Sequence, residues 1–139
     1  MKPSDLARLH ASAFDATRAW STQEFEQLLQ ANGVQLCGDH RGFVLIRVTI
    51  DEAEILTIAT DPPHQRKGLA RAMLAQAERT AGAAGATTMF LEVAENNVAA
   101  KALYHDCGYL GVGRRPGYYM PKDGAPVAAL VLRKKLIAI

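Results

Sequence analysis

The fold of this chain is decided by one stretch, Ile55-Leu56-Thr57-Ile58-Ala59-Thr60-Asp61-Pro62-Pro63-His64-Gln65-Arg66-Lys67-Gly68-Leu69-Ala70. Its first six residues are apolar or β-branched and contain neither Gly nor Pro, which predicts a buried strand. Asp61-Pro62-Pro63 ends that strand, because proline has no N–H to donate and restricts the residue before it. From about Gly68 onward apolar residues recur at helical spacing. A strand, a short loop and a helix are therefore expected in succession.

The loop of this unit, Gln65 to Ala70, has the properties of an anion site. Gly68 has no side chain and Ala70 only a methyl group, so backbone N–H groups can approach a ligand closely. The start of the helix adds free donors and the positive end of the helix dipole. Arg66, Lys67 and Arg71 add positive charge. The loop is thus predicted to bind a phosphate group, although it is neither a Walker loop nor Gly-x-Gly-x-x-Gly.

Length and composition indicate one globular domain over residues 1–139. Hydrophobic residues make up 49% and charged residues 22%, and the net charge of +2 is too small to argue for a nucleic-acid or membrane partner. No signal peptide and no run long enough to span a bilayer are visible, so a cytoplasmic location is expected. The four histidines show no metal spacing, and Cys37 and Cys107 are expected to be buried free thiols.

The rest of the chain alternates between helical and strand patterns, which predicts a mixed α/β (α+β) fold. One helix is expected to start at Pro3-Ser4, with a stripe of Leu6, Leu9, Ala13 and Phe14, and a second after Ser21, where Glu24 completes a capping box and Gly33 ends the helix. Asn96-Asn97 is expected to cap a third, closed by Gly108. The remaining predictions are strands at 34–37, 43–50, 87–93, 109–115 and 125–136, a turn at 38–42 and a loop at 116–124.

Three ordered motifs resemble one known superfamily. Gln65, Gly68 and Ala70 are similar to the Gln/Arg-x-x-Gly-x-Gly/Ala pyrophosphate signature of the GNAT superfamily of acetyl-CoA-dependent N-acetyltransferases. Within it, two further segments, and also Trp20-Ser21-x-x-x-Phe25, resemble the bacterial RimI-type ribosomal-protein-alanine N-acetyltransferases. These segments are Leu91-Glu92-Val93 with Asn97, Ala102-Leu103-Tyr104 and Gly108-Tyr109, and Arg115-Pro116-Gly117-Tyr118-Tyr119 with Asp123-Gly124.

This resemblance implies a fold and a co-substrate. The fold would be a GNAT domain, with a central mixed, mostly antiparallel sheet of six to seven strands and about four flanking helices. The co-substrate would be acetyl-CoA, with no metal. Its contacts would come from Ile58, Ala59, Thr60, Gln65, Arg66, Lys67, Gly68, Leu69, Ala70, Arg71 and Asn97.

The resemblance also implies two catalytic roles. Amine acetylation needs a neutral nitrogen, so a base removes a proton as the amine attacks the thioester, and an acid protonates the departing thiolate. Glu92 matches the base and Tyr104 the acid, with Glu54 and then Glu52 as rival bases. Each residue has a simpler interpretation: Glu92 as a solvated or salt-bridged carboxylate, Tyr104 as a core tyrosine, Asn97 as a helix cap. Trp20 either lines a substrate groove or packs where its helix begins.

The acceptor implied is the N-terminal α-amine of a protein, contacted by Arg115, Tyr118, Tyr119 and Glu54. A small-molecule amine acetyltransferase and a non-catalytic acyl-CoA-binding domain stay as alternatives. One departure from the RimI-type pattern is Val127, where the relatives usually carry an acidic residue after Asp-Gly. A monomer or weak homodimer is expected.

Overall fold

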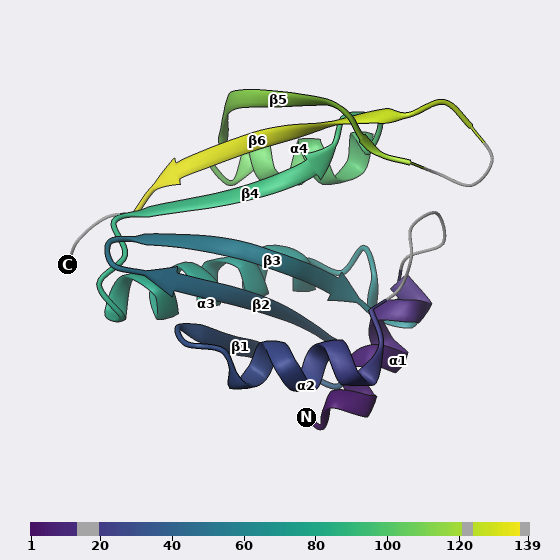
Figure 1. Ribbon diagram of the computed structural model, residues 1–139, viewed down its shortest axis with the longest axis vertical. Coiled ribbons are helices and arrows are strands. Elements are labelled where there is room, and N and C mark those ends of the chain that lie inside the picture. Colours follow the sequence, from purple (N-terminus) through teal and green to yellow (C-terminus); the bar gives the residue numbers. More distant parts are fainter. Residues whose placement is uncertain (14–19, 121–123, 137–139) are drawn as a thin grey trace.

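The computed structural model describes residues 1–13, 20–120 and 124–136. Within them, four α-helices flank one six-stranded sheet with the strand order β1-β2-β3-β4-β6-β5 (Figure 1). The strands are β1 (Val34–Asp39), β2 (Gly42–Thr49), β3 (Glu52–Thr60), β4 (Thr88–Ala94), β5 (Leu110–Tyr119) and β6 (Val127–Lys135). The helices are α1 (Pro3–Ala13), α2 (Thr22–Gln30), α3 (Leu69–Ala83) and α4 (Val98–Asp106), with a 3-10 turn η1 (Pro62–His64).

The sheet is mixed and mostly antiparallel, as predicted. Only β3 and β4 run parallel, and they are joined by the crossover through α3. The other neighbouring pairs are antiparallel. The predicted mixed α/β architecture is therefore confirmed. Six to seven strands are expected, and the described residues form six.

Two hydrophobic clusters cover the two faces of the sheet. Met73, Leu74 and Ala77 of α3 and Tyr104 of α4 pack with Leu91 and other residues on one face. Leu6 and Leu9 of α1 and Phe25 of α2 pack with Phe43 and Leu45 on the other. Successive side chains of a strand point to opposite faces, so the cluster in which a strand residue packs shows which face its side chain is on. We call the first the α3/α4 face and the second the α1/α2 face.

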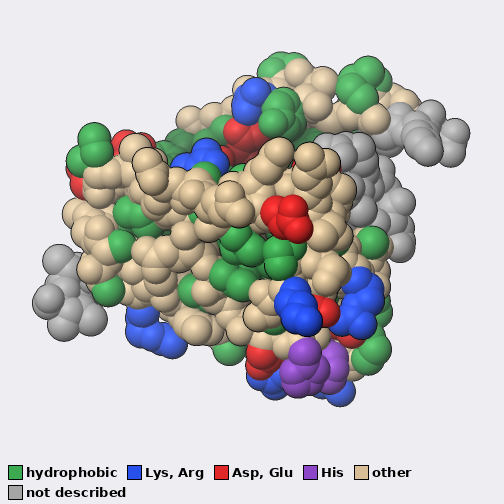
Figure 2. Space-filling model, turned by 60° about the horizontal axis from the view of Figure 1, so that its bottom comes forward, with side chains coloured by type: hydrophobic (Ala, Val, Ile, Leu, Met, Phe, Trp, Pro, Cys, Tyr) green, Lys and Arg blue, Asp and Glu red, His purple; other side chains and the backbone are tan. Residues whose placement is uncertain are grey.

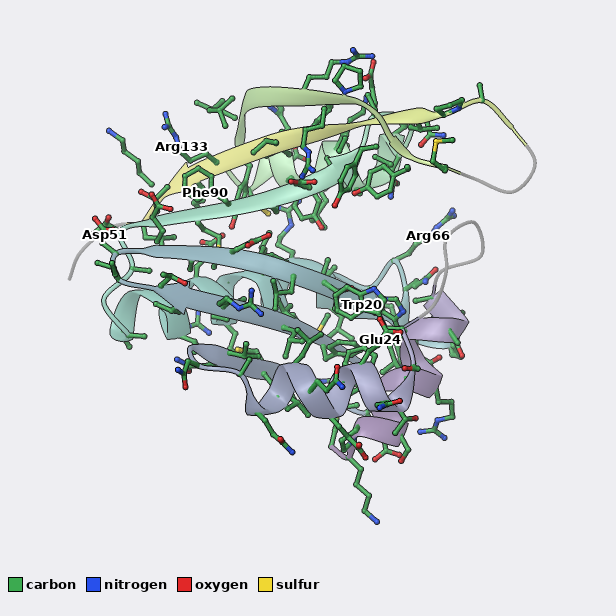
Figure 3. All side chains as sticks on the ribbon, viewed as in Figure 1. Trp20, Glu24, Asp51, Arg66, Phe90 and Arg133 are labelled. Atoms are coloured by element: carbon green, nitrogen blue, oxygen red, sulfur yellow. The ribbon has the colours of Figure 1, made fainter. Side chains whose placement is uncertain are left out.

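The start of α2 forms as the sequence predicts. Ser21 Oγ accepts from the Glu24 N–H at 3.1 Å, and Glu24 Oε1 accepts from the Ser21 N–H at 3.2 Å, which completes the capping box. Trp20 precedes the cap and its ring lies 5.5 Å from that of Phe25, in the arrangement of a hydrophobic staple. Trp20 therefore packs at the helix entry, which supports the structural interpretation of this residue (Figure 3).

Several predicted boundaries were wrong. The β1–β2 hairpin turn holds only His40 and Arg41, since pairing continues to Asp39↔Gly42, and β3 already begins at Glu52. The largest error is the loop predicted to start at Pro116, because β5 runs on to Tyr119. Pairing skips from Arg115↔Ala129 to Tyr119↔Val127, so Pro116, Gly117 and Tyr118 form an irregularity in which proline needs no ladder hydrogen bond.

Smaller features also bear on the predictions. α2 ends at Gln30 rather than at Gly33, and Phe14 lies outside the described residues. Both cysteines are free, but Cys107 is only partly buried whereas Cys37 is buried. In the described part of the chain, no helix is long and apolar enough to cross a membrane, and no cluster of three or more His, Cys, Asp or Glu has the arrangement of a metal site.

Burial of His10 predicts that stability depends on pH. The ring is 4% exposed, stacks on Trp20 and accepts the Trp20 N–H at Nδ1 over 3.2 Å. Burial lowers the pKa of His10 from 6.5 to about 4, against a smaller opposing effect of Glu24. The unfolded chain therefore binds more protons between these values. The stabilisation from neutral His10 is complete above about pH 6.5 and is lost as the pH falls towards 4.

We expect His10→Asn to flatten this pH dependence, because Asn offers an acceptor near the place of Nδ1 but does not titrate. The measurement is the free energy of urea unfolding between pH 7.5 and 4, compared with wild type and with His40→Asn, an exposed control. Equal slopes in wild type and His10→Asn would contradict the assignment.

Candidate active site

An opening in the middle of the sheet organises the site. The parallel strands β3 and β4 pair only over three positions, ending at Glu54↔Phe90, and then diverge towards their C-terminal ends (Figure 1). Past that point β3 pairs only with β2, and β4 only with β6. The facing edges, residues 55–60 and 91–94, therefore carry backbone N–H and C=O groups with no strand between them. Such groups need a polar partner, either water or a ligand.

A β-bulge lies on the β3 side of this opening. The register of the β2–β3 pair shifts between Leu45↔Thr57 and Ile46↔Ile55, which leaves Leu56 as the extra residue. Bulges interrupt the ladder and turn neighbouring groups in new directions. The irregularity thus falls on the strand segment that faces the opening.

All three candidate bases, Glu92, Glu54 and Glu52, line one pocket at the narrow end of the opening. Leu91 packs on the α3/α4 face, so its neighbour Glu92 points to the opposite, α1/α2 face. Glu54 pairs with Arg47, which follows Leu45 at strand spacing and lies on the same α1/α2 face. The pocket has a volume of about 280 Å³ and is lined by Arg47, Thr49, Glu52, Ala53, Glu54, Phe90, Leu91, Glu92 and Val131.

Glu92 is held by an arginine from the neighbouring hairpin. Arg115 Nη1 donates to Glu92 Oε1 at 2.7 Å, and the Glu92 side chain is 27% exposed. The guanidinium of Arg115 also lies 4.0 Å from the centre of the Tyr118 ring, which in turn contacts Tyr119 edge-on. The hydrogen bond to Glu92 raises the pKa of Arg115. The predicted acceptor residues are thus brought to the predicted base, and Arg115 contacts that base directly.

Tyr104 lies on the other face. It projects from α4 into the core of the α3/α4 face and is 6% exposed. Burial, followed by the nearby Tyr119 and Cys107, raises the pKa of Tyr104 to about 12. No described residue hydrogen-bonds its hydroxyl, yet the described part of the chain has no buried side-chain oxygen without a partner. The ring is therefore a core residue, as the simpler interpretation held, while the hydroxyl reaches an accessible point.

The loop predicted to bind phosphate, Gln65 to Ala70, follows β3 and runs into the start of α3, as expected. Arg66 and Gly68 both have positive φ, 62° and 79°, and Gly68 forms the N-cap of α3 without any side-chain cap bond. The N–H groups of residues 69–71 donate to no described residue. Gln65 turns inward instead, and its Nε2 donates to the Thr60 carbonyl at 3.0 Å, which closes the loop onto the end of β3. Figure 3 shows Arg66 at the wide end of the opening and Phe90 near the narrow end.

Comparison with known proteins identifies the family. Residues 5–109 match the acetyltransferase (GNAT) family. The chain belongs to this family. It is similar to the ribosomal protein bS18-alanine N-acetyltransferase of Escherichia coli K12, with 37% identity over 94 residues that cover 68% of this chain and 64% of the relative. The match thus spans somewhat less than two thirds of that relative.

Solved structures of acetyltransferases have the same fold as this chain. The crystal structure of the ribosomal-protein-S18-alanine N-acetyltransferase from Escherichia coli superimposes with a TM-score of 0.86 and 29% identity, covering 96% of this chain and 87% of that one. Arabidopsis thaliana NAA60 in complex with acetyl-CoA has a TM-score of 0.81 at 16% identity, covering 97% and 93%. The second likeness concerns the fold alone.

The remaining candidates lie on α3, α4 and β3. Asn97 caps α4, where its Oδ1 accepts from the Ala100 N–H at 3.1 Å. Arg71 reaches from α3 to α4, 3.7 Å from an Asp106 oxygen and 3.7 Å from Cys107 Sγ. On β3, Ile58 is half-buried on the α3/α4 face and Ala59 is buried on the other, so neither side chain is free to reach far. Their backbone faces the opening.

A second pocket beside the loop was missed at the level of sequence. It is lined by Arg41, His64, Lys67, Gly68, Leu69 and Ala72. His40 and His64 meet edge-on there, and histidine, lysine and arginine side chains gather together on this face (Figure 2). Arg41 is partly neutralised by its bond to Asp39 at 2.7 Å. Arg41 lies in the β1–β2 turn, far in sequence from the loop at Gln65 to Ala70. In the sequence, only its positive charge could have indicated a role in anion binding.

The Asn97 cap can be separated from a cofactor role by substitution. Asn97→Ala removes the cap and should cost about 1 kcal/mol of unfolding free energy, whereas Asn97→Ser retains a capping oxygen and should cost little. If the amide also contacts the cofactor, Asn97→Ser should raise the KM for acetyl-CoA with stability nearly unchanged. The measurements are urea unfolding and initial rates. An unaltered KM in Asn97→Ser would leave Asn97 as a cap alone.

Proposed function

We propose that this protein is an acetyl-CoA-dependent N-acetyltransferase whose acceptor is the N-terminal α-amine of a protein. Residues 1–139 would act as one domain, and a cytoplasmic location and a monomer or weak homodimer stay predictions from the sequence. The observation that carries the proposal is the opening between β3 and β4. It has Glu92 on one face, Tyr104 on the other and a loop of free N–H groups at its wide end.

The opening suits the two chemical parts of acetyl-CoA. The pyrophosphate would bind the N–H groups at the start of α3, where Arg66, Lys67 and Arg71 add positive charge. The pantetheine arm carries amides, which can hydrogen-bond to the unpaired edge of β3 as an added strand does. The contacts we assign are Ile58, Ala59, Thr60, Arg66, Lys67, Gly68, Leu69, Ala70, Arg71 and Asn97. Gln65, which the sequence also predicts as a contact, would act by shaping the loop, because its side chain is bonded to the Thr60 carbonyl.

Placement on opposite faces supports separate proton-transfer roles. The acceptor amine would approach from the α1/α2 face, where Glu92 takes its proton directly or through water as the nitrogen attacks the thioester carbon. The C–S bond then breaks, and the sulfur leaves on the α3/α4 face, where Tyr104 can donate to it. No covalent enzyme intermediate is needed, so Cys107 has no assigned role.

The acceptor assignment rests on the hairpin and on the relatives' names. Arg115, Tyr118 and Tyr119 cluster against Glu92 and would line the path of a peptide, with the exposed Glu54 lining the same pocket as Glu92. The Escherichia coli relatives are named for acetylating the alanine of ribosomal protein bS18. Val127 begins β6 opposite Tyr119, so an apolar side chain stands where the RimI-type relatives usually have an acid. We therefore assign the class of acceptor and not one ribosomal protein.

A small amine is the second candidate, favoured by the charge of the pocket. Glu52, Glu54 and Glu92 line it together, against Arg47 as the one basic lining residue. A polyamine would carry matching positive charge. A peptide remains our choice because the Tyr118–Tyr119 pair forms a larger aromatic wall than a small amine requires.

The test is acetyl transfer measured by mass spectrometry. The protein is incubated with acetyl-CoA and either peptides of varied free N-termini or polyamines and aminoglycosides, and Gly68→Glu serves as the loop variant. We expect a gain of one acetyl group on peptide α-amines in preference to lysine side chains. Gly68→Glu should lose this activity through charge repulsion at the loop, together with strain at the positive φ of Gly68. Gly82→Glu, in open space on the same helix, should stay active. Turnover of small amines alone would favour the second candidate, and no transfer to any amine would favour a non-catalytic domain.

If Glu92 is the base, Glu92→Gln should lower kcat/KM by about 10²–10⁴-fold near neutral pH. Part of the loss should return at high pH, where the free amine is already neutral, since an α-amine has a pKa of about 7.7–8.0. The measurement is a pH–rate profile for both proteins. Glu54→Gln is the matched comparison in the same pocket, and a larger loss in that variant would reverse the assignment.

Tyr104→Phe should lower kcat without rescue at high pH, because its proton is needed when sulfur leaves and not before. The ring stays packed, so the melting temperature and the acetyl-CoA affinity should change little. With a pKa of about 12, Tyr104 keeps its proton up to about pH 10. Ionisation of this group should therefore cause no decrease in wild-type kcat as the pH is raised to about 10. A folded and fully active Tyr104→Phe would remove Tyr104 from the mechanism.

A further inference from the structure

A partly buried polar cluster of Glu78, Tyr109 and Lys134 lies behind Tyr104 and has no part in the proposed reaction. The Tyr109 hydroxyl donates to Glu78 Oε2 at 3.0 Å, and Lys134 Nζ donates to Glu78 Oε1 at 2.8 Å. Tyr109 is 1% exposed, and the side chains of Glu78 and Lys134 are 16% and 29% exposed. The three residues come from α3, the turn after α4, and β6. The cluster thus links α3 and β6 to the chain segment that directly follows α4.

Tyr109 is joined to Tyr104 in two ways. The Tyr109 N–H donates to the Tyr104 carbonyl at 2.9 Å, and the Gly108 N–H donates to the His105 carbonyl at 3.0 Å. With Gly108 at φ 96°, this is a Schellman motif that ends α4. The rings of Tyr104 and Tyr109 also meet edge-on, with centres 5.9 Å apart. A shift of Tyr109 would therefore move both the backbone and the ring of Tyr104.

Stability alone gives little reason for an ion pair at this place. Partly exposed ion pairs gain little net stability, because solvent screens the attraction and any burial of the charges is costly. The Glu78–Lys134 pair instead fixes the position of the Glu78 carboxylate. Glu78 accepts from both sides, so the Tyr109 hydroxyl has one fixed partner instead of a choice of positions.

We infer that Tyr109 is a positioning residue for Tyr104: Glu78, itself fixed by Lys134, holds the Tyr109 hydroxyl, and Tyr109 holds the Tyr104 hydroxyl at the opening. The inference rests on the proposed function, in which Tyr104 donates to the leaving sulfur. Small displacements of a catalytic group have large effects, since an error of about 1 Å can cost about 10²-fold in rate.

A double-mutant cycle separates positioning from general stability. Tyr109→Phe keeps the ring and the Schellman bonds but loses the hydroxyl. We expect it to lower kcat about tenfold, with the KM for acetyl-CoA changed less than about twofold. In Tyr104→Phe the hydroxyl to be positioned is absent, so adding Tyr109→Phe should cause no further loss. Rates are measured at saturating acetyl-CoA and a peptide with N-terminal alanine, well below each melting temperature.

Matched variants sharpen the cycle. Glu78→Ala should behave as Tyr109→Phe does, whereas Glu78→Gln retains an acceptor for the hydroxyl and should keep most of kcat. Thr80→Val removes another side-chain bond of α3, the one from Cys37 Sγ at 3.5 Å, and should leave kcat unchanged. Losses that multiply in the double mutant, or an unchanged kcat in Tyr109→Phe, would overturn the inference.

A measurement independent of turnover distinguishes this inference from the proposed function. The protein is labelled with 3-fluorotyrosine, and the fluorine NMR signal of Tyr104 is assigned by its absence in Tyr104→Phe. We expect that signal to shift or broaden in Tyr109→Phe and Glu78→Ala but not in Thr80→Val, whether or not an acceptor is turned over. A signal that stays in place would overturn the positioning role even in an active enzyme, while a shifted signal in an inactive protein would count against the proposed function only.

Discussion

The structure depends on the early end of a single parallel strand pair. β3 and β4 pair over three positions and then part, although each is held along its other edge. If the pair continued, its two edges would satisfy each other and the sheet would be closed. Because it stops, the facing edges of β3 and β4 carry two rows of backbone groups that no neighbouring strand pairs. A ligand that carries amides in an extended chain can satisfy what the missing pairs leave open.

The burial of Tyr104 bears on what kind of proton donor it would be in the proposed reaction. Burial raises its pKa to about 12, well above the value of about 8.5 for an ordinary thiol. Full proton transfer to a thiolate would thus cost about 5 kcal/mol, so in that reaction the hydroxyl would act first by donating a hydrogen bond to the sulfur as charge develops. That role needs accurate placement more than acidity, which is the physical reason why the contacts behind Tyr104 matter.

What the sequence could predict was local. The capping box of Ser21 and Glu24, the staple of Trp20 and Phe25, and the glycines at Gly68 and Gly108 each depend on residues within a few positions of one another. The bulge at Leu56 depends on how β2 aligns with β3, and the extension of β5 past Pro116 depends on β6. The sequence predicts a loop from Pro116 onward, but β5 is an edge strand, where proline is tolerated. The Glu78–Lys134–Tyr109 cluster joins three distant segments, so no spacing in the sequence could indicate it.

Arg115 shows how the same limit affects the interpretation of a site residue. The motif grouped it with the acceptor-binding tyrosines, whereas the structure bonds it to Glu92. A carboxylate paired with a guanidinium could be thought unavailable as a base. The bond uses only Oε1, however, and no described residue donates to Oε2. A carboxylate has acceptor sites on both oxygens, so Glu92 can keep Arg115 on one and receive an amine or water on the other. If Glu92 is the base as proposed, the ion pair would orient it and still leave Oε2 accessible, because Arg115 is held in turn over the Tyr118 ring.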